Sequence, residues 1–199
     1  MFNPEKVFKS VTLSEFKIKD DDDRFISNID EEGLPPRNSR HKITISLDLD
    51  NTLLHVEEGG TLVFRPYAIQ FLQKIKKLEG IEIIAWTASK YFHCNRVVQA
   101  LEKNSGVKFD YILFCHDSVD QHKAGFHKDF KHTNRDPETF IHVDDNTYIC
   151  RNINHVTYVI APFFSHNGID TNLIYCYDDI LQHIAMNKKG KVSKLNFMI

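Results

Sequence analysis

Apolar, β-branched segments alternate with amphipathic segments from residue 42 onward, and this alternation limits the fold more than any other feature. The strand patterns cover residues 43–48, 81–86, 111–114, 140–143 and 156–160. The helical patterns cover residues 68–78, 91–101 and 171–186. Nearly continuous apolar strands separated by helices are typical of a parallel sheet covered on both faces. We therefore predict an α/β fold with a parallel sheet of about five strands, helices on both faces, and a short β-hairpin insert after the first strand.

The chain of 199 residues divides by composition into three parts. Residues 1–40 contain an acidic run at 20–23 and a Pro-rich breaker at 34–39, so we expect a peripheral or partly flexible N-terminal extension. Residues 41–186 contain all the strand and helix patterns and are expected to form the single folded domain. Residues 187–199 carry lysines and no acid, and we expect a basic C-terminal tail.

Composition also restricts the setting of the protein. No apolar run is long enough to cross a membrane, and the first residues show no signal-peptide pattern. The four cysteines are scattered without a C-x-x-C pair, as in a reducing compartment. We expect an intracellular protein, cytoplasmic or nuclear and not secreted. With 25 Lys+Arg against 27 Asp+Glu, the near-neutral charge gives no indication of nucleic-acid binding, without excluding it.

Polar residues follow three of the predicted strands, and a lysine precedes the fourth. These residues are Asp48, Asp50, Thr87, Lys128, Asp144 and Asp145. Because parallel strands end at the same edge of a sheet, these side chains are expected to meet there. Four carboxylates repel one another unless a hard divalent cation joins them, and Mg²⁺ prefers carboxylate and carbonyl oxygens. The set therefore suggests metal-assisted phosphoryl transfer.

Each residue can be given a role in that chemistry. Asp48 could attack phosphorus as the nucleophile, and Asp50 could act as the general acid and then the general base. Lys128 and Thr87 could hold the phosphoryl oxygens. Taken singly, an aspartate pair is as readily a helix cap as a functional site, and a lysine is usually a surface residue. The order of the motifs along alternating elements is what favours the functional interpretation.

At these residues the chain resembles the haloacid dehalogenase (HAD) superfamily. Within it, the chain is similar to the NLI-interacting-factor or C-terminal-domain phosphatase group. The matching segments are Asp48-Leu-Asp-Asn-Thr-Leu-Leu-His55, Arg65-Pro66-Tyr67, Trp86-Thr87-Ala88-Ser89, Lys128-Asp129-Phe130 and Val143-Asp144-Asp145-Asn146. The resemblance covers roughly residues 34–185.

The resemblance implies a Rossmann-like, HAD-like fold and a Mg²⁺-dependent phosphatase that works through a phospho-aspartate. It assigns Asp48 as nucleophile and Asp50 as general acid/base. The implied metal ligands are Asp48, the backbone carbonyl of Asp50, and Asp144 or Asp145. The implied phosphate-binding residues are Thr87, Ala88 and Lys128, with Thr52 and Asn146 in support. Substrates in the group are phosphoserine or phosphothreonine in proteins, of which the tail of RNA polymerase II is the best known, so a phosphoprotein partner is favoured.

Several departures from the group leave alternatives open. Asn51 replaces a usual Glu, Tyr67 stands where the group has Gly, and Asp145 where it has Asn. The hairpin insert is shorter than the element that binds a substrate proline in the small polymerase-tail phosphatases. A phosphatase for a small phosphoester or a nucleic-acid end is therefore one alternative, and a catalytically weak binding module is another. A substrate contact by His127 or Arg135 is a further hypothesis. The sequence predicts no oligomeric state.

Overall fold

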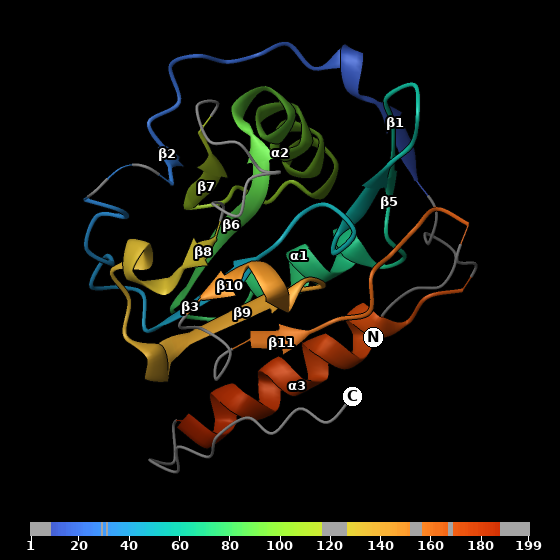
Figure 1. Cartoon of the computed structure of the whole chain (residues 1–199). Helices are drawn as coiled ribbons and strands as arrows, with labels where there is room; N and C mark the ends of the chain where they lie inside the picture. The colour runs from blue at the N-terminus through green and yellow to red at the C-terminus, as the bar shows by residue number, and fades with distance from the viewer. Residues whose placement is uncertain are drawn as a thin grey trace.

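The computed structural model describes residues 9–28, 30, 32–116, 127–151, 157–166 and 169–187. Its centre is a six-stranded sheet in the order β11-β9-β3-β6-β7-β2, and all neighbouring strands run parallel (Figure 1). The strands are β2 (Phe25–Ser27), β3 (Ile43–Leu47), β6 (Ile81–Lys90), β7 (Tyr111–Cys115), β9 (Phe140–Asp144) and β11 (Thr157–Val159). The predicted α/β class with a parallel sheet is confirmed, and the sixth strand comes from the N-terminal extension.

The two faces of the sheet are covered by different kinds of structure. The α-helices α1 (Ala68–Lys76), α2 (Tyr91–Ser105) and α3 (Asn172–Asn187) share one hydrophobic core with alternate strand residues such as Ile45 and Ile83. The intervening residues, including Ile84 and Trp86, face a second, smaller core with Leu34. This second face carries the 3-10 helices η3 (Phe130–Thr133) and η5 (Thr147–Ile149) and the paired strands β8 (Lys128–Asp129) and β10 (Cys150–Arg151).

The predicted hairpin forms a small sheet of its own. Strands β4 (Leu54–Val56) and β5 (Thr61–Phe64) pair antiparallel around Gly59 and Gly60, whose φ angles of 92° and 85° favour glycine. Strand β1 (Ser10–Thr12) pairs with the other side of β5, so the sheet has the order β1-β5-β4. The 3-10 helix η2 (Leu13–Glu15) follows β1 directly, and η4 (Pro137–Thr139) precedes β9.

The described part of the N-terminal extension is attached to the domain at several points. Figure 1 shows it arching over α2 between β1 and β2. The Tyr91 hydroxyl of α2 donates to the carbonyl oxygen of Lys19 at 2.6 Å. Within the acidic run, Asp22 pairs with Arg24 at 2.6 Å, and Arg24 also reaches Glu102 of α2 at 2.6 Å. Part of the acidic run is therefore neutralised by ion pairing.

Two expectations about the setting can be compared with the structure. All four cysteines are free and buried. Across the described residues, no helix combines the length and the apolar character needed to cross a membrane. The lysines of the predicted basic tail lie outside the described residues.

Candidate active site

The centre of the site is a buried lysine between two aspartates. Lys128, at the start of β8, has no exposed surface, and its Nζ donates to Asp48 Oδ1 and to Asp144 Oδ2 at 2.6 Å each. Asp48 directly follows β3, and Asp144 ends the neighbouring strand β9. The parallel arrangement of β3 and β9 brings the two carboxylates to one edge of the sheet.

The two carboxylates that contact this ammonium have pKa values shifted in opposite directions. Burial raises the pKa of Asp48 to about 8, Lys128 opposes the rise, and the Asp144 charge adds to it. Burial also acts to raise the pKa of Asp144, but the Lys128 charge and a hydrogen bond from His142 outweigh it and lower that pKa. Burial acts to lower the pKa of Lys128, but the two carboxylate charges outweigh it and raise that pKa. The cluster has more carboxylates than its lysine can neutralise, so a further cation would favour ionised Asp48.

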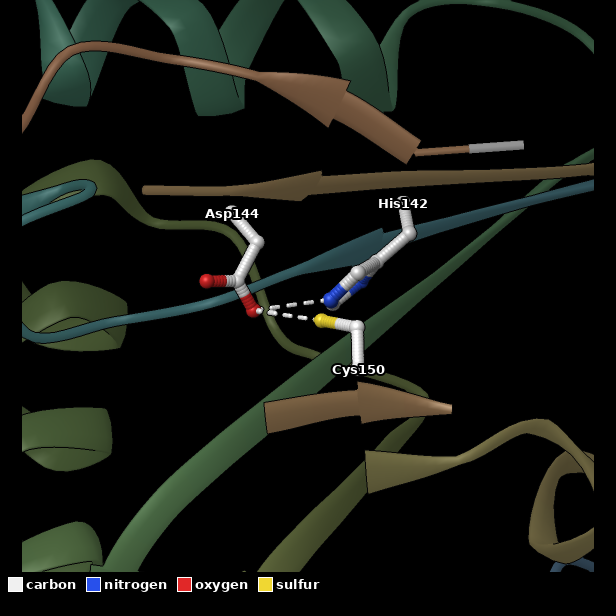
Figure 2. A group of neighbouring side chains, drawn as sticks. All are labelled: His142, Asp144 and Cys150. Atoms are coloured by element: carbon white, nitrogen blue, oxygen red, sulfur yellow. Dashed lines mark hydrogen bonds and ion pairs between the residues drawn. The ribbon is translucent and has the colours of Figure 1, made fainter. Parts of the chain in front are cut away.

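Behind Asp144, on the second face of the sheet, lie His142 and Cys150 (Figure 2). His142 Nε2 donates to Asp144 Oδ2 at 2.9 Å, and Cys150 Sγ donates to the same oxygen at 3.7 Å. Burial lowers the pKa of His142 and raises the pKa of Cys150 to about 12, so both groups are neutral donors. His142 Nδ1 is then able to accept from the Ser46 hydroxyl at 3.1 Å. We interpret this group as a hydrogen-bond network that fixes the Asp144 carboxylate.

Asp145 completes an acidic group with Asp48 and Asp144. Oxygen atoms of these three carboxylates all lie within 4.8 Å of one another. The Thr52 hydroxyl donates to Asp145 Oδ1 at 3.2 Å and accepts from the Asp145 backbone N–H at 3.2 Å. The Asn146 N–H donates to Asp144 Oδ1 at 2.7 Å. Thr52 and Asn146 therefore hold the two acids in place, and the three carboxylates are the residues that could hold a hard cation.

Asp50 is held apart from this cluster by a different pair of donors. Its Oδ1 accepts from His93 Nε2 at 2.8 Å, and its Oδ2 accepts from the Ser89 hydroxyl at 2.7 Å. Burial acts to raise the pKa of Asp50, but the His93 hydrogen bond and charge outweigh it, and the pKa is lowered. The hydrogen bond to Asp50 in turn raises the pKa of His93.

The predicted phosphate-binding residues of β6 lie in an irregular part of that strand. β6 continues to Lys90, beyond the predicted end at residue 86, and its pairing with β7 shifts register between Trp86 and Lys90. Thr87 is buried, and its Oγ1 accepts from the Ser89 backbone N–H at 3.0 Å. Ala88 is half-buried. Phosphate binding by Thr87 and Ala88 stays a prediction.

Arg65 connects the loop after β3 to the chain beyond β11. Its guanidinium is buried and donates to the Thr52 carbonyl at 3.1 Å, to the Ala161 carbonyl at 2.8 Å, and to Asp170 at 2.8 Å. A fully buried ion pair is stable only when the other N–H groups of its arginine are also hydrogen-bonded. Most of those of Arg65 are. Arg65 therefore helps to fix the loop that carries Asp50 and Thr52.

Two positions where the chain departs from the resembled group adopt left-handed backbone conformations. Asn51 has a φ of 62°, and Tyr67, just before α1, has a φ of 68°. Asparagine tolerates this region through its short polar side chain, whereas tyrosine is strained there. Asn51 Oδ1 also contacts His55 Nδ1 at 2.9 Å. The Gly-to-Tyr departure at position 67 thus occurs where the backbone favours glycine.

The structure corrects one hypothesis about substrate contacts. Arg135 is buried, and its guanidinium donates to both carboxylate oxygens of Glu82 at 2.7 and 2.8 Å and to the Pro35 carbonyl at 2.8 Å. Glu82 is the second residue of β6, near the end of the strand opposite to Thr87. The hypothesis of a substrate contact by Arg135 is therefore wrong, because its charge is already paired in the interior, near the amino end of the strands. The corresponding hypothesis for His127 stays a prediction.

Sequence reasoning missed His93 and His142, which contact the carboxylates of the site. His142 lies inside the apolar pattern of residues 140–143, where a polar residue reads as an ordinary strand residue. His93 lies in the first turn of α2, and this helix begins directly after β6. Because a helix that follows a parallel strand starts at the carboxyl edge of the sheet, the polar residues of its first turn were the available signal.

The site is thus a cluster of aspartates bridged by a buried lysine at the carboxyl edge of a parallel sheet. The family model described as NLI interacting factor-like phosphatase matches residues 43–193, which is more than half of the chain, so the chain belongs to that family. The predicted membership of the NLI-interacting-factor and C-terminal-domain phosphatase group is thereby confirmed.

Two curated proteins of Dictyostelium discoideum are similar to part of the chain. A CTD small phosphatase-like protein 2 is 29% identical over 133 residues, covering 57% of this chain and 23% of the relative. A probable C-terminal domain small phosphatase is 33% identical over 122 residues, covering 52% of this chain and 38% of the relative. The chain thus spans well under half the length of these relatives.

Among solved structures, the chain is similar to the fission yeast RNA polymerase II CTD phosphatase Fcp1, in a variant form bound to beryllium fluoride. The TM-score is 0.48 and the sequence identity 16%, and the match covers 75% of this chain and 52% of that chain.

Proposed function

We propose that the protein is a Mg²⁺-dependent phosphatase that hydrolyses phosphomonoesters through a phosphorylated Asp48. The observation that carries this proposal is the buried contact of Lys128 with both Asp48 and Asp144 at the carboxyl edge of the sheet. A nucleophilic carboxylate, a fixed cation beside it and further acidic ligands are the groups that phosphoryl transfer to an aspartate requires. Membership of the phosphatase family supports the same activity.

The donor set fits Mg²⁺. Asp48, Asp144 and Asp145 offer only carboxylate oxygens in close proximity, and one ammonium cannot neutralise all three charges. These three residues, with the backbone carbonyl of Asp50, are the proposed metal ligands. When bound, Mg²⁺ would neutralise negative charge on the phosphoryl oxygens and favour the ionised form of Asp48.

The remaining steps use the chain's own residues. Asp48 attacks phosphorus as the bond to the leaving oxygen breaks, and Asp50 supplies the proton that this oxygen takes up. Lys128 offsets the charge that spreads over the phosphoryl oxygens. Asp50, now a carboxylate, then removes a proton from the water that hydrolyses the acyl phosphate on Asp48. Thr87 and Ala88 are proposed to orient the phosphate during both steps.

For the substrate, we propose phosphoserine or phosphothreonine in a protein. The support is the family and the names of the two similar proteins, both of which refer to small phosphatases of the C-terminal-domain type. We also propose that the protein is cytoplasmic or nuclear, a location that suits a phosphoprotein substrate. The binding-module alternative is less consistent with the site, because Asp48, Asp50, Lys128 and Asp144 are all present and in contact with partners.

Removal of divalent metal is expected to abolish hydrolysis. Protein treated with EDTA and dialysed should release no p-nitrophenolate from p-nitrophenyl phosphate, and added Mg²⁺ should restore the rate in a saturable manner. Calorimetric titration of Mg²⁺ into the wild type and into Asp144→Asn and Asp145→Asn variants would identify the stronger ligand. Full turnover by metal-free protein, or no turnover at saturating Mg²⁺, would contradict the proposal.

A parallel substrate panel tests the phosphoprotein proposal. Phosphoserine and phosphothreonine peptides, sugar phosphates, nucleotides and nucleic acids with phosphorylated ends would be compared at equal concentration by release of inorganic phosphate. We expect the highest kcat/KM with phosphopeptides. A preference for a small phosphoester or a nucleic-acid end would replace the proposed substrate with that alternative while leaving the phosphatase activity intact.

A further inference from the structure

We propose that His93 is a positioning residue for Asp50, anchoring Oδ1 of its carboxyl group so that Oδ2 delivers the proton to the leaving group. This inference rests on the proposed function, in which Asp50 is the general acid. It adds to that function a residue of α2 and an assignment of the two carboxyl oxygens.

The geometry gives Asp50 two donors of different kinds. His93 Nε2 lies 2.8 Å from Oδ1, and the Ser89 hydroxyl lies 2.7 Å from Oδ2. An imidazole N–H is fixed in direction by its ring, whereas a hydroxyl hydrogen rotates and the oxygen can also accept. The Ser89 hydroxyl can therefore turn from donor to acceptor when Oδ2 carries a proton, while His93 keeps its bond to Oδ1.

Both donors lie at the junction of β6 and α2, beside Lys90, where β6 resumes its pairing with β7. Ser89 is the penultimate residue of β6, and His93 is the third residue of α2, which begins with no intervening loop. Residues on strands and helices hold a reacting group more tightly than residues on loops. The β6–α2 junction thus sets the orientation of Asp50 independently of the loop that carries it.

The exposure of the pair places it where a leaving group could reach it. The side chains of His93 and Asp50 are 34% and 29% exposed, whereas those of Asp48 and Asp144 are 8% and 1% exposed. Asp50 therefore lies on the more open side of the site. A partly exposed ion pair contributes little to folding stability, so replacing His93 should alter activity more than stability.

The chemical demand on Asp50 depends on the leaving group. As the bond between phosphorus and the ester oxygen breaks, its electron pair stays on that oxygen, and a bond forms from phosphorus to Asp48. An alkoxide, such as that of serine, must take the proton from Asp50 in this step, whereas p-nitrophenolate is stable without it. As Asp50 gives up its proton, negative charge develops on its carboxyl group, and the His93 N–H is already in place to stabilise it.

The test is the leaving-group dependence of kcat/KM, which reports on phosphorylation of Asp48 and not on the later hydrolysis. The wild type and His93→Ala would be compared at saturating Mg²⁺ with p-nitrophenyl phosphate and with an alkyl phosphate or phosphoserine peptide. We expect His93→Ala to lose about 10- to 100-fold with the alkyl ester and less than about threefold with the aryl ester. His93→Gln, which keeps a side-chain N–H, should recover part of the loss. Gln99→Ala, further along α2, is the matched control and should match the wild type.

Each outcome supports or overturns the proposal. Equal losses with both esters, or no loss with either, would overturn the role of His93. A larger loss with Ser89→Ala than with His93→Ala would overturn the assignment of Oδ1 as the anchored oxygen. Asp50→Asn, measured in parallel, separates the two levels of proposal. If it shows the leaving-group-dependent loss and His93→Ala does not, only the inference about His93 fails. If Asp50→Asn shows no such loss, or if the wild type hydrolyses neither ester, the proposed mechanism fails and the inference falls with it.

Discussion

Replacing Asp48 with Asn should reduce Mg²⁺-dependent hydrolysis of p-nitrophenyl phosphate by a factor on the order of 10⁴ or more. The amide is nearly the same size as the carboxylate but cannot attack phosphorus to form an acyl phosphate. Asp48 is the residue that directly follows β3, and from that position it contacts Lys128. Initial rates at saturating Mg²⁺ and substrate would measure the loss.

Asp145→Asn provides a matched comparison for this prediction. It makes the same chemical change in a neighbouring acid whose carboxylate accepts a hydrogen bond from the Thr52 hydroxyl. Its loss of rate should be relieved by raising the Mg²⁺ concentration, because it weakens a metal ligand and leaves the nucleophile intact. A beryllium or aluminium fluoride adduct found on any residue other than Asp48, or substantial activity of Asp48→Asn, would refute the assignment.

Replacing Lys128 with Met should destabilise the fold more than any of the other substitutions. Lys128 is fully buried between two carboxylates, and its removal leaves this pair of buried acids without the cation that both contact. Breaking a buried pair by deleting one partner typically costs about 3–5 kcal/mol. We expect a loss of this size in the free energy of unfolding, measured by urea denaturation in metal-free buffer. Saturating Mg²⁺ should reduce the loss, since the metal would bind and neutralise the same carboxylates.

Lys131→Met is the control for this change. Lys131 lies a short way further along the chain, its side chain is 72% exposed, and its Nζ lies 3.9 Å from Asp129. Loss of a surface pair of this kind should change the unfolding free energy by no more than about 0.5 kcal/mol. If the two methionine variants were equally stable, the cluster of Lys128, Asp48 and Asp144 would not be the buried electrostatic centre that the structure describes.

The gathering of Asp48, Asp144 and Lys128 could be predicted because it depends only on order and direction. A strand that ends in an acid fixes where that acid lies once the sheet is known to be parallel. Lys128 could be predicted only from its motif, because hydrophobic periodicity does not locate a single residue within the long connection before β9. The pairing of Lys128 with both acids, and not with one, depends on side-chain packing and emerges only in the structure.

Other features could not be predicted because they depend on packing between distant segments. Strand β2 has only three residues, and it is a strand only because β7 offers it an open edge. A polar residue in the first turn of α2 is a signal for a site residue, but the contact of His93 with Asp50 depends on side-chain packing across the β6–α2 junction. An arginine close in sequence to a site suggests an anion ligand, but the partner of Arg135 is Glu82, which lies at the opposite end of the sheet.

Strands β1 and β2 have a practical consequence for anyone who expresses this domain. The family match begins at residue 43, and a shortened chain starting there would lack both strands. The outer edges of β7 and β5 would then expose unpaired backbone N–H and C=O groups, which is the arrangement that promotes edge-to-edge aggregation. Phe25, which packs against Phe114 and Tyr91, would also be lost from the end of the core. The boundary of the folded unit therefore lies well upstream of the boundary of the family.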